Sequence, residues 1–406
     1  MRTYRELFRV PEFRPLFLVV SAQVAASTVN GLALGTLVYA GTGSPLLAAL
    51  SLFGPSFAQV VGATTLLSVA DRVPPRAALV TIALLLGTSV LVLAAPGMPI
   101  GAMFVVIAFM GLVGSMGGGV RWGLLGEILP DGGYLLGRSV FNMSVGAMQI
   151  SGFALGGVLL TFASPRRVLL IGAGLYLTAA LVARFGLSRR APRSVGRPSV
   201  RRTWQVNVTL WSDPARRYVY LALWVPNGLV VGCEALFIPY APGTAGVLFL
   251  SGALGMLVGD TVVGRFVPPH WRSRLVTPLQ LLLGVPYLLF ALPLPLPAAA
   301  LAVAAASAGF GGGVLLQQRL VDLTPSEVRG QALGLHSSGM LTMQAVAATL
   351  AGALAQWLSA SGAMVTMAVL SLLVTLLLRP KLRFRRPVDV RPPADPVADP
   401  VGSPLN

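Results

Sequence analysis

Only two acidic side chains, Glu234 and Asp260, lie inside the long apolar stretches of this sequence. An ionisable group at that depth in a membrane costs at least about 2.5–3.5 kcal/mol, so it is retained where it meets a wet cavity or a partner. Glu234 could exchange a proton, contact a cationic ligand or simply form a hydrogen bond between helices. Asp260 is close enough in sequence to Arg265 or Arg274 for a gating or structural ion pair.

The sequence contains few residues or motifs for metal binding, covalent catalysis or nucleotide binding. His270 and His336 are the only histidines, and neither belongs to a cluster with metal-ligand spacing. Cys233, beside Glu234, is the only cysteine, which excludes an internal disulfide. The sequence contains no nucleophile-elbow motif and no phosphate-binding loop. We therefore expect neither an enzyme nor an ATP-driven pump, and no metal or organic cofactor.

Glu234 and Asp260 belong to a chain with twelve apolar stretches of about twenty residues, the length that an α-helix needs to cross a bilayer. A mean hydropathy of +0.78 and only 11% charged residues leave too little polar surface for a soluble chain. The sequence predicts an all-α membrane protein with transmembrane helices at 15–40, 44–70, 77–95, 99–120, 138–163, 167–185, 218–241, 244–266, 275–293, 298–320, 331–358 and 360–378.

The net charge of +17 is distributed along the chain in a way that argues against a nucleic-acid partner. All but two of the 30 basic residues, Arg166 and Arg167, fall in alternate gaps between the spans. This is the positive-inside pattern, and it predicts that both termini lie in the cytoplasm. We expect no cleaved signal peptide, because residues 1–14 contain no short apolar core followed by a small-residue cleavage site. We expect a multi-pass protein of the plasma membrane whose partners are the lipid bilayer and a small molecule, working as a monomer.

The chain also repeats itself. A Val-Pro-Pro tripeptide at 73–75 recurs at 267–269, and Gly-Gly-Gly-Val at 117–120 recurs at 311–314, both at an offset of 194 residues. Six spans in each half give two parallel repeats, an architecture found in secondary transporters. The predicted division is a cytoplasmic N-terminus at 1–14, six-helix bundles at 15–185 and 218–378, a cytoplasmic linker at 186–217 and a disordered tail at 379–406.

Several short motifs resemble the major facilitator superfamily, most closely its twelve-helix branch of drug and macrolide exporters. The run FRPLF at 13–17 opens the first helix as in that branch, and LVY at 37–39 followed by TGS at 42–44 matches its first outer turn. Asp71, Arg72 and Arg76 resemble the family signature between helices two and three. The resemblance implies the major facilitator fold, and it implies that Asp71 caps a helix of the other half. A solvated turn aspartate is the alternative.

Helix five resembles the antiporter motif of the exporters, with Phe153 in place of its proline. The resemblance implies a conformational role for its glycines, whereas ordinary close packing of helices is the alternative. The glycines concerned are Gly152, Gly156 and Gly157.

Further polar residues in the spans are candidates for a cavity wall. The sequence Pro226-Asn227-Gly228 is expected to interrupt helix seven and to form a hinge near Glu234, with polar groups satisfying the carbonyl that the proline frees. Trp224 could stack on a flat ligand or pack against lipid. The polar candidates for coupling or substrate contact are Asn30, Gln59, Asn142, Gln149, Asn227, Glu234 and Gln344, although some of them could only join helix to helix.

These features predict a secondary transporter that exports a small amphipathic or lipophilic compound by alternating access. A proton gradient could drive it through Glu234, although helix four lacks the mid-membrane arginine that many proton-coupled relatives have. An importer or a lipid flippase of the same fold is the alternative. The sequence does not identify the substrate.

Overall fold

The computed structural model describes residues 4–65, 73–129, 133–191, 200–325 and 328–382, and the elements formed by these residues are helices. Twelve helices or helix pairs are long and apolar enough to cross a membrane, in agreement with the predicted spans. The tail predicted to be disordered begins at 379, but residues 379–382 form turns, and Leu382 is buried and accepts a hydrogen bond from Arg319 at 2.6 Å. The rest of the predicted tail lies outside the described residues.

The N-terminal half is a bundle of six long helices preceded by one short turn. Helix α2 is central, because it packs against α3, α7 and α8. Helix α5 packs between α6 and α8, and α6 also packs on α3. The elements are α1 (Tyr4–Leu7), α2 (Phe13–Thr42), α3 (Pro45–Thr65), α5 (Pro75–Leu93), α6 (Ile100–Ile128), α7 (Gly133–Phe162) and α8 (Pro165–Gly186).

The C-terminal half repeats this bundle with more breaks in its helices. Helix α10 packs against α16 and α17, and α12 packs against α14. The spans are formed by α10 (Pro214–Glu234) with α11 (Phe237–Tyr240), α12 (Ala245–Thr261) with a π-helical turn η1 (Val262–Phe266), α13 (Pro269–Gly284) with a 3₁₀ turn η2 (Val285–Ala291), α14 (Leu296–Ala308) with α15 (Gly311–Asp322), α16 (Arg329–Trp357) and α17 (Ala360–Leu378).

The repeated Val-Pro-Pro motif begins a helix in each half. Pro75 and Pro269 occupy the first turn of α5 and α13, and the preceding Pro74 and Pro268 are the extended N-cap residues. Proline suits the first helical turn because its missing N–H would have no partner there. The internal repeat in the sequence therefore marks equivalent helix starts.

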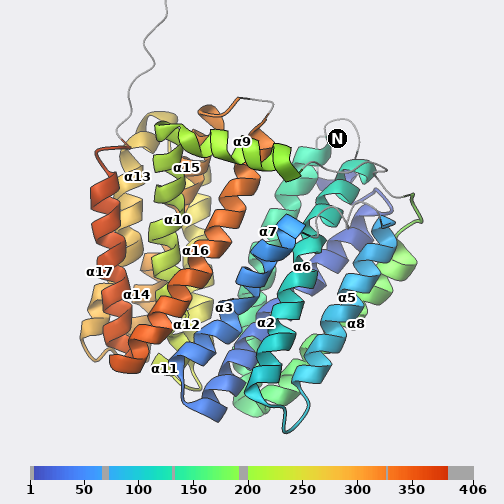
Figure 1. Ribbon diagram of the computed structural model, residues 1–406, viewed down its shortest axis with the longest axis horizontal. Helices are drawn as coiled ribbons and strands as arrows, with labels where there is room; N and C mark the ends of the chain where they lie inside the picture. Colours follow the sequence, from blue (N-terminus) through green and yellow to red (C-terminus); the bar gives the residue numbers. More distant parts are fainter. Residues whose placement is uncertain (1–3, 66–72, 130–132, 192–199, 326–327, 383–406) are drawn as a thin grey trace, which may run out of the picture.

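A further helix, α9 (Val200–Ser212), lies within the segment that joins the halves and packs on α10 and α16. Its Trp211 ring stacks on the Trp224 ring of α10, with 5.5 Å between the centroids. Figure 1 shows α9 across one end of the bundle, with the short helix α11 at the other. We name these the α9 end and the α11 end. Helix α9 is tied to the C-terminal half.

The two halves meet near the α11 end. Gly157 of α7 and Gly246 of α12 touch through their backbones, since a Cβ atom on Gly246 would lie 2.5 Å from the Gly157 Cα. Gly352 of α16 packs equally closely on Leu46 of α3. In Figure 1 the ribbons of the halves converge toward α11 and stand apart toward α9. These small residues allow helices of different halves to approach within backbone contact.

Candidate functional site

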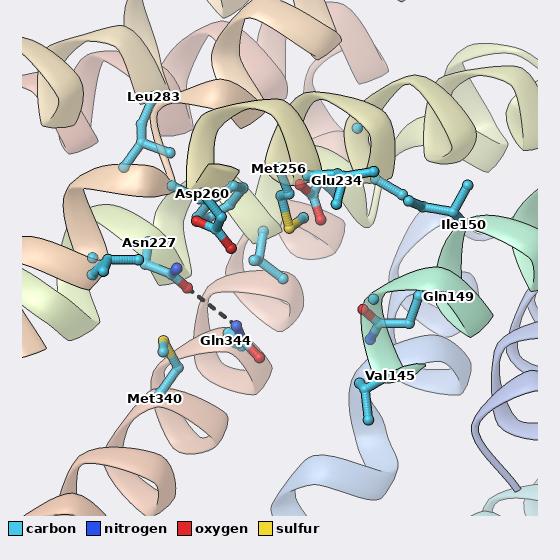
Figure 2. Close-up of a pocket in the computed structure, with 18 of the residues that line it drawn as sticks. Val145, Gln149, Ile150, Asn227, Glu234, Met256, Asp260, Leu283, Met340 and Gln344 are labelled. Atoms are coloured by element: carbon cyan, nitrogen blue, oxygen red, sulfur yellow. Dashed lines mark hydrogen bonds between the residues drawn. The ribbon is translucent and has the colours of Figure 1, made fainter. Parts of the chain in front are cut away.

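A cavity of about 710 Å³ lies between the halves. Its wall comes mostly from the C-terminal half, through α10, α12, α13, α15 and α16, with α7 and one residue of α3 opposite. Helix α7 contributes Val145, Gln149 and Ile150, which Figure 2 shows across the cavity from Asn227, Asp260 and Gln344.

The lining residues are exposed toward one end of the cavity and buried toward the other. Met143 of α7 is 53% exposed, and Asp260 of α12 is also exposed. Farther along these helices, Phe153 stacks on Phe249 with ring centroids 4.8 Å apart, and Phe237 meets Phe249 edge to face. The cavity is therefore closed by aromatic rings toward the α11 end and opens toward the α9 end.

Glu234 is the last residue of α10, where the span breaks before α11 begins. The residue is 8% exposed, and its side chain points into the cavity (Figure 2). Its Oε1 atom accepts no hydrogen bond from the described part of the chain. A buried carboxyl oxygen without a partner is costly, so a ligand, a proton or water is required there.

Cys233 points the other way. It is fully buried, and its Sγ atom donates to the Met364 carbonyl of α17 at 3.3 Å. The neighbours Cys233 and Glu234 thus lie on different faces of one helix. The cysteine is shielded from the cavity and from any reagent within it.

The expectation that Pro226 interrupts its helix is wrong. Helix α10 continues through the proline, because the carbonyl that it frees has another partner. The Gln280 Nε2 atom of α13 donates to the Ala222 carbonyl at 2.7 Å, which is the group four residues before the proline. Ser371 of α17 donates to the Pro226 carbonyl at 3.2 Å. The predicted compensation by neighbouring polar groups is present, and a hinge at Pro226 and Gly228 stays a prediction.

Two of the predicted polar residues are paired in the cavity wall. The Gln344 Nε2 atom of α16 donates to Asn227 Oδ1 of α10 at 3.1 Å (Figure 2). Gln149 also lines the cavity, from the opposite half. These amides offer uncharged donors and acceptors to a ligand.

Asp260 lines the cavity, but the ion pair predicted for it is absent. Among the described residues, no salt bridge joins its carboxylate to Arg265 or Arg274. Arg265 lies in η1 and is exposed, whereas Asp260 faces the cavity.

Three predicted cavity residues lie elsewhere. Asn30 is buried inside the N-terminal bundle, where its side chain occupies the space beside Gly172 of α8. Gln59 packs beside Gly114 of α6. Trp224 donates to the His336 carbonyl at 3.0 Å and stacks on Trp211. Asn30 and Gln59 thus pack between helices of one half, although both amide atoms of Asn30 lack a hydrogen-bond partner among the described residues. Trp224, expected from the sequence to stack on a flat ligand or pack against lipid, instead packs within the C-terminal half.

The glycines of the antiporter-like segment divide into two groups. Gly152 packs on Thr28, and Gly156 packs on Val29 and Leu32, so both hold α7 against α2. Gly157 instead meets Gly246 of the other half. Only the last of the three lies at the contact between halves.

Some predicted residues fall where little or nothing is described. Asp71 and Arg72 lie outside the described residues, as does the side chain of Asn142. Arg76 lies in the first turn of α5 and is half-buried. The roles implied by the family signature therefore stay predictions.

Sequence reasoning missed Gln280, Gln317 and the aromatic closure. Gln280 and Gln317 line the cavity from α13 and α15, and each is a polar residue inside a span predicted from the sequence. That signal was visible in the sequence. The pairing of Phe153 with Phe249 was not, because it depends on how α7 and α12 cross.

Comparison with known proteins gives a clear result at the level of fold. No family profile and no curated sequence matches this chain. A solved POT family transporter in complex with a thioalcohol-conjugated peptide aligns with a TM-score of 0.72 at 14% identity, over 92% of this chain and 96% of that one. The nucleoside transporter NupG aligns with a TM-score of 0.75 at 12% identity, over 91% and 99%. The chain has the major facilitator fold.

In this fold the cavity lies between the two parallel six-helix repeats that the sequence predicted. At 12–14% identity the neighbours establish the fold alone. The length and apolar composition of the twelve long helices described above suit a multi-pass membrane protein. The closer resemblance to the drug-efflux branch stays a prediction.

Proposed function

We propose that this protein is a secondary transporter that exports a small amphipathic molecule by alternating access. One observation carries the proposal, namely a cavity of about 710 Å³ between two repeats that is closed toward one end and open toward the other. The volume lies within the range of about 300–1,000 Å³ that is usual for small-molecule sites. Alternating access requires a central cavity that the protein closes first at one end and then at the other.

The lining favours an apolar or amphipathic molecule. Most lining residues are apolar, phenylalanines and methionines among them, and the polar ones are amides, the Thr261 hydroxyl and two carboxyls. Methionine adapts its shape to different ligands, which suits a site that must hold and release a lipophilic compound. A sugar or phosphate ester would need a denser set of polar groups.

Glu234 is the proposed coupling residue. It lines the cavity, is buried at the closed end and has one carboxyl oxygen without a described partner. A carboxyl in this position can take up a proton in one state and lose it in the other, which is the requirement for proton coupling. No organic cofactor is needed for this cycle.

We place the protein in the plasma membrane, with the α9 end facing the cytoplasm. The positive-inside pattern supports it, since the arginine-rich segment 184–217 includes α9. The cavity of the described state would then open inward, ready to receive a substrate for export. We propose that a single chain suffices, because the cavity is formed within it.

An importer is the second candidate. The peptide and nucleoside transporters that share the fold keep this alternative open, because an inward-open cavity is a stage of uptake as well as of export. Counterflow and net flux in vesicles of opposite orientation separate the two directions.

The proposal is tested with purified protein in proteoliposomes, by screening labelled amphipathic compounds for movement driven by a pH gradient. Wild type should move at least one compound, and Glu234→Gln should lose gradient-driven transport while keeping its insertion and thermal stability. Gln59→Leu is the matched control, because Gln59 packs on α6 outside the cavity. Full gradient-driven activity of Glu234→Gln between about pH 6 and 8 removes Glu234 from the mechanism.

A further inference from the structure

The charges of the cavity are all of one sign. Glu234 and Asp260 are the two carboxyls of its wall, and the described lining residues include no arginine, lysine or histidine. Arg265, the nearest candidate in sequence after Asp260, is exposed outside the lining. A ligand entering this space therefore meets negative charge without a neutralising partner.

Neither carboxyl is satisfied by the protein. Oε1 of Glu234 has no described hydrogen-bond partner although the residue is more than nine-tenths buried. Asp260 forms no salt bridge within the described chain. Charges attract one another more strongly where water is excluded, so the unpaired carboxyl of the buried Glu234 makes the closed end a favourable place for a cation. Asp260 adds a second negative charge nearer the open end.

The remainder of the wall is suited to an apolar body. Phe153, Phe237 and Phe249 lie at the closed end beside Glu234, and Met256 and Met340 lie along the cavity. Aromatic faces attract cations as well as apolar groups, and methionine sulfur is polarizable. The site thus pairs negative charge with aromatic and thioether surface.

We propose that the molecule carried in this cavity is a lipophilic organic cation, whose positive group is held by Asp260 near the open end and by Glu234 near the closed end. This inference rests on the proposed transport function and specifies its substrate class.

The same wall argues against anions and zwitterions. A peptide or an amino acid carries a carboxylate, and the described lining offers no basic side chain to receive one. The Asn227–Gln344 pair can donate or accept hydrogen bonds, but it is uncharged. The charge of the cavity therefore distinguishes this chain from a carrier of peptides, although a POT family transporter shares its fold.

The test uses two probes of nearly the same size and shape but opposite charge, the tetraphenylphosphonium cation and the tetraphenylborate anion. Binding to the full-length protein in detergent is measured by equilibrium dialysis, after subtraction of binding to protein-free micelles. We expect the cation to bind specifically and the anion to bind at least tenfold more weakly. Asp260→Asn and Glu234→Gln should each weaken cation binding by about tenfold.

Asp213→Asn is the matched control, because Asp213 caps the start of α10 outside the cavity and asparagine preserves a cap. It should leave binding unchanged. Thermal unfolding of each variant verifies that the chain is folded, and Asp260 is exposed enough to accept an isosteric amide. Equal binding of both ions, preference for the anion, or unchanged cation binding by folded Asp260→Asn and Glu234→Gln would overturn the inference.

The outcomes separate this inference from the proposed function. Transport of neutral compounds by the reconstituted protein, without preference for the cation, contradicts the substrate class and leaves the transporter intact. Specific cation binding that the carboxyl variants abolish, with no compound moved by the wild type, supports the cation site and contradicts transport.

Discussion

The two halves of this protein share one architecture but differ in regularity. In the N-terminal half, α2, α6 and α7 run unbroken for 30, 29 and 30 residues. In the C-terminal half, four spans are broken or change their helical form, at α10 to α11, at η1, at η2 and between α14 and α15. The glycine triplets show the contrast, since α6 passes through Gly117 whereas α15 begins at Gly311, its equivalent.

The breaks lie beside the polar groups of the cavity. Glu234 is the last residue of α10, and Asp260 is one residue before the end of α12. At the repeat offset, Gln280 corresponds to Leu86, a core residue of the N-terminal half. Broken helices leave backbone groups that need polar partners or water. We infer that the C-terminal half forms the binding wall and that the N-terminal half serves as its rigid counterpart.

The largest expected effect comes from separating the halves at the α11 end. Gly246→Leu would place a side chain where a Cβ atom already lies 2.5 Å from the Gly157 Cα. Overpacking of this kind costs about 1–3 kcal/mol, so the equilibrium constant for closing this end should fall by about fivefold or more. Transport measured in proteoliposomes should fall accordingly. Gly101→Leu, at the start of α6 in open space, is the control and should transport normally.

The next effect tests the irregularity of the C-terminal half. Gln280→Leu copies the residue of the N-terminal half and leaves the Ala222 carbonyl without its described donor. A buried unpaired carbonyl costs about 1–3 kcal/mol, which thermal unfolding in detergent should detect. Pro226→Ala restores an N–H to that carbonyl, so Gln280→Leu should cost less in a Pro226→Ala background. Equal losses in both backgrounds would mean that Gln280 does not compensate for the proline.

A smaller effect is expected from the aromatic closure. Phe153 and Phe249 stack across the halves at 4.8 Å, and such pairs contribute about 0.5–1.5 kcal/mol beyond their burial. A double-mutant cycle of Phe153→Leu and Phe249→Leu should show this coupling in the population closed at the α11 end, measured with spin labels. Phe8→Leu, in a ring cluster of the N-terminal half alone, should leave that population unchanged. Strict additivity of the two leucine variants would contradict the closure.

The smallest effect on stability is expected at a clamp at the α9 end of the N-terminal half, by which we mean the contacts of Glu12, before α2, with Ser188 and Arg190, after α8. Burial raises the pKa of Glu12, but hydrogen bonds from Ser188 and Arg190, with the charge of Arg190, outweigh it and lower the pKa below its usual value. A lowered pKa stabilises the fold above the unfolded-state pKa of about 4.3, and this stabilisation is lost as the pH falls through the folded-state pKa.

Glu12→Gln should therefore reduce stability by less than about 1 kcal/mol at pH 7, because the carboxyl is partly exposed. Its difference from wild type should shrink below about pH 4. Thermal unfolding over this pH range provides the measurement, and a difference that grows in acid would show that the clamp acts in another way.

Much of the fold was readable in the sequence, because span length, basic gaps and internal repeats each report on a whole helix. Single side chains were less predictable. Asn30 and Gln149 both interrupt apolar spans, yet Asn30 packs on Gly172 while Gln149 lines the cavity. Which face a helix turns inward depends on its packing partners, and a span that is apolar on all sides carries little periodic signal. The break predicted at Pro226 was wrong for a related reason. The hydrogen bond that replaces the one lost at the proline comes from Gln280, which lies on another helix.

Alternating opening of the two ends can be measured as distances at both ends of one helix pair, α7 of the N-terminal half and α12 of the C-terminal half. In a Cys233→Ala background, spin labels are placed at Arg138 with Gly264 near the α9 end, and at Thr161 with Val247 near the α11 end. All four positions are exposed, on α7 and on α12 with η1. The account predicts two populations in lipid, in which one pair is long where the other is short, with ligand or pH shifting both in opposite directions. A single distance for each pair under all conditions, or both pairs lengthening together, would contradict it.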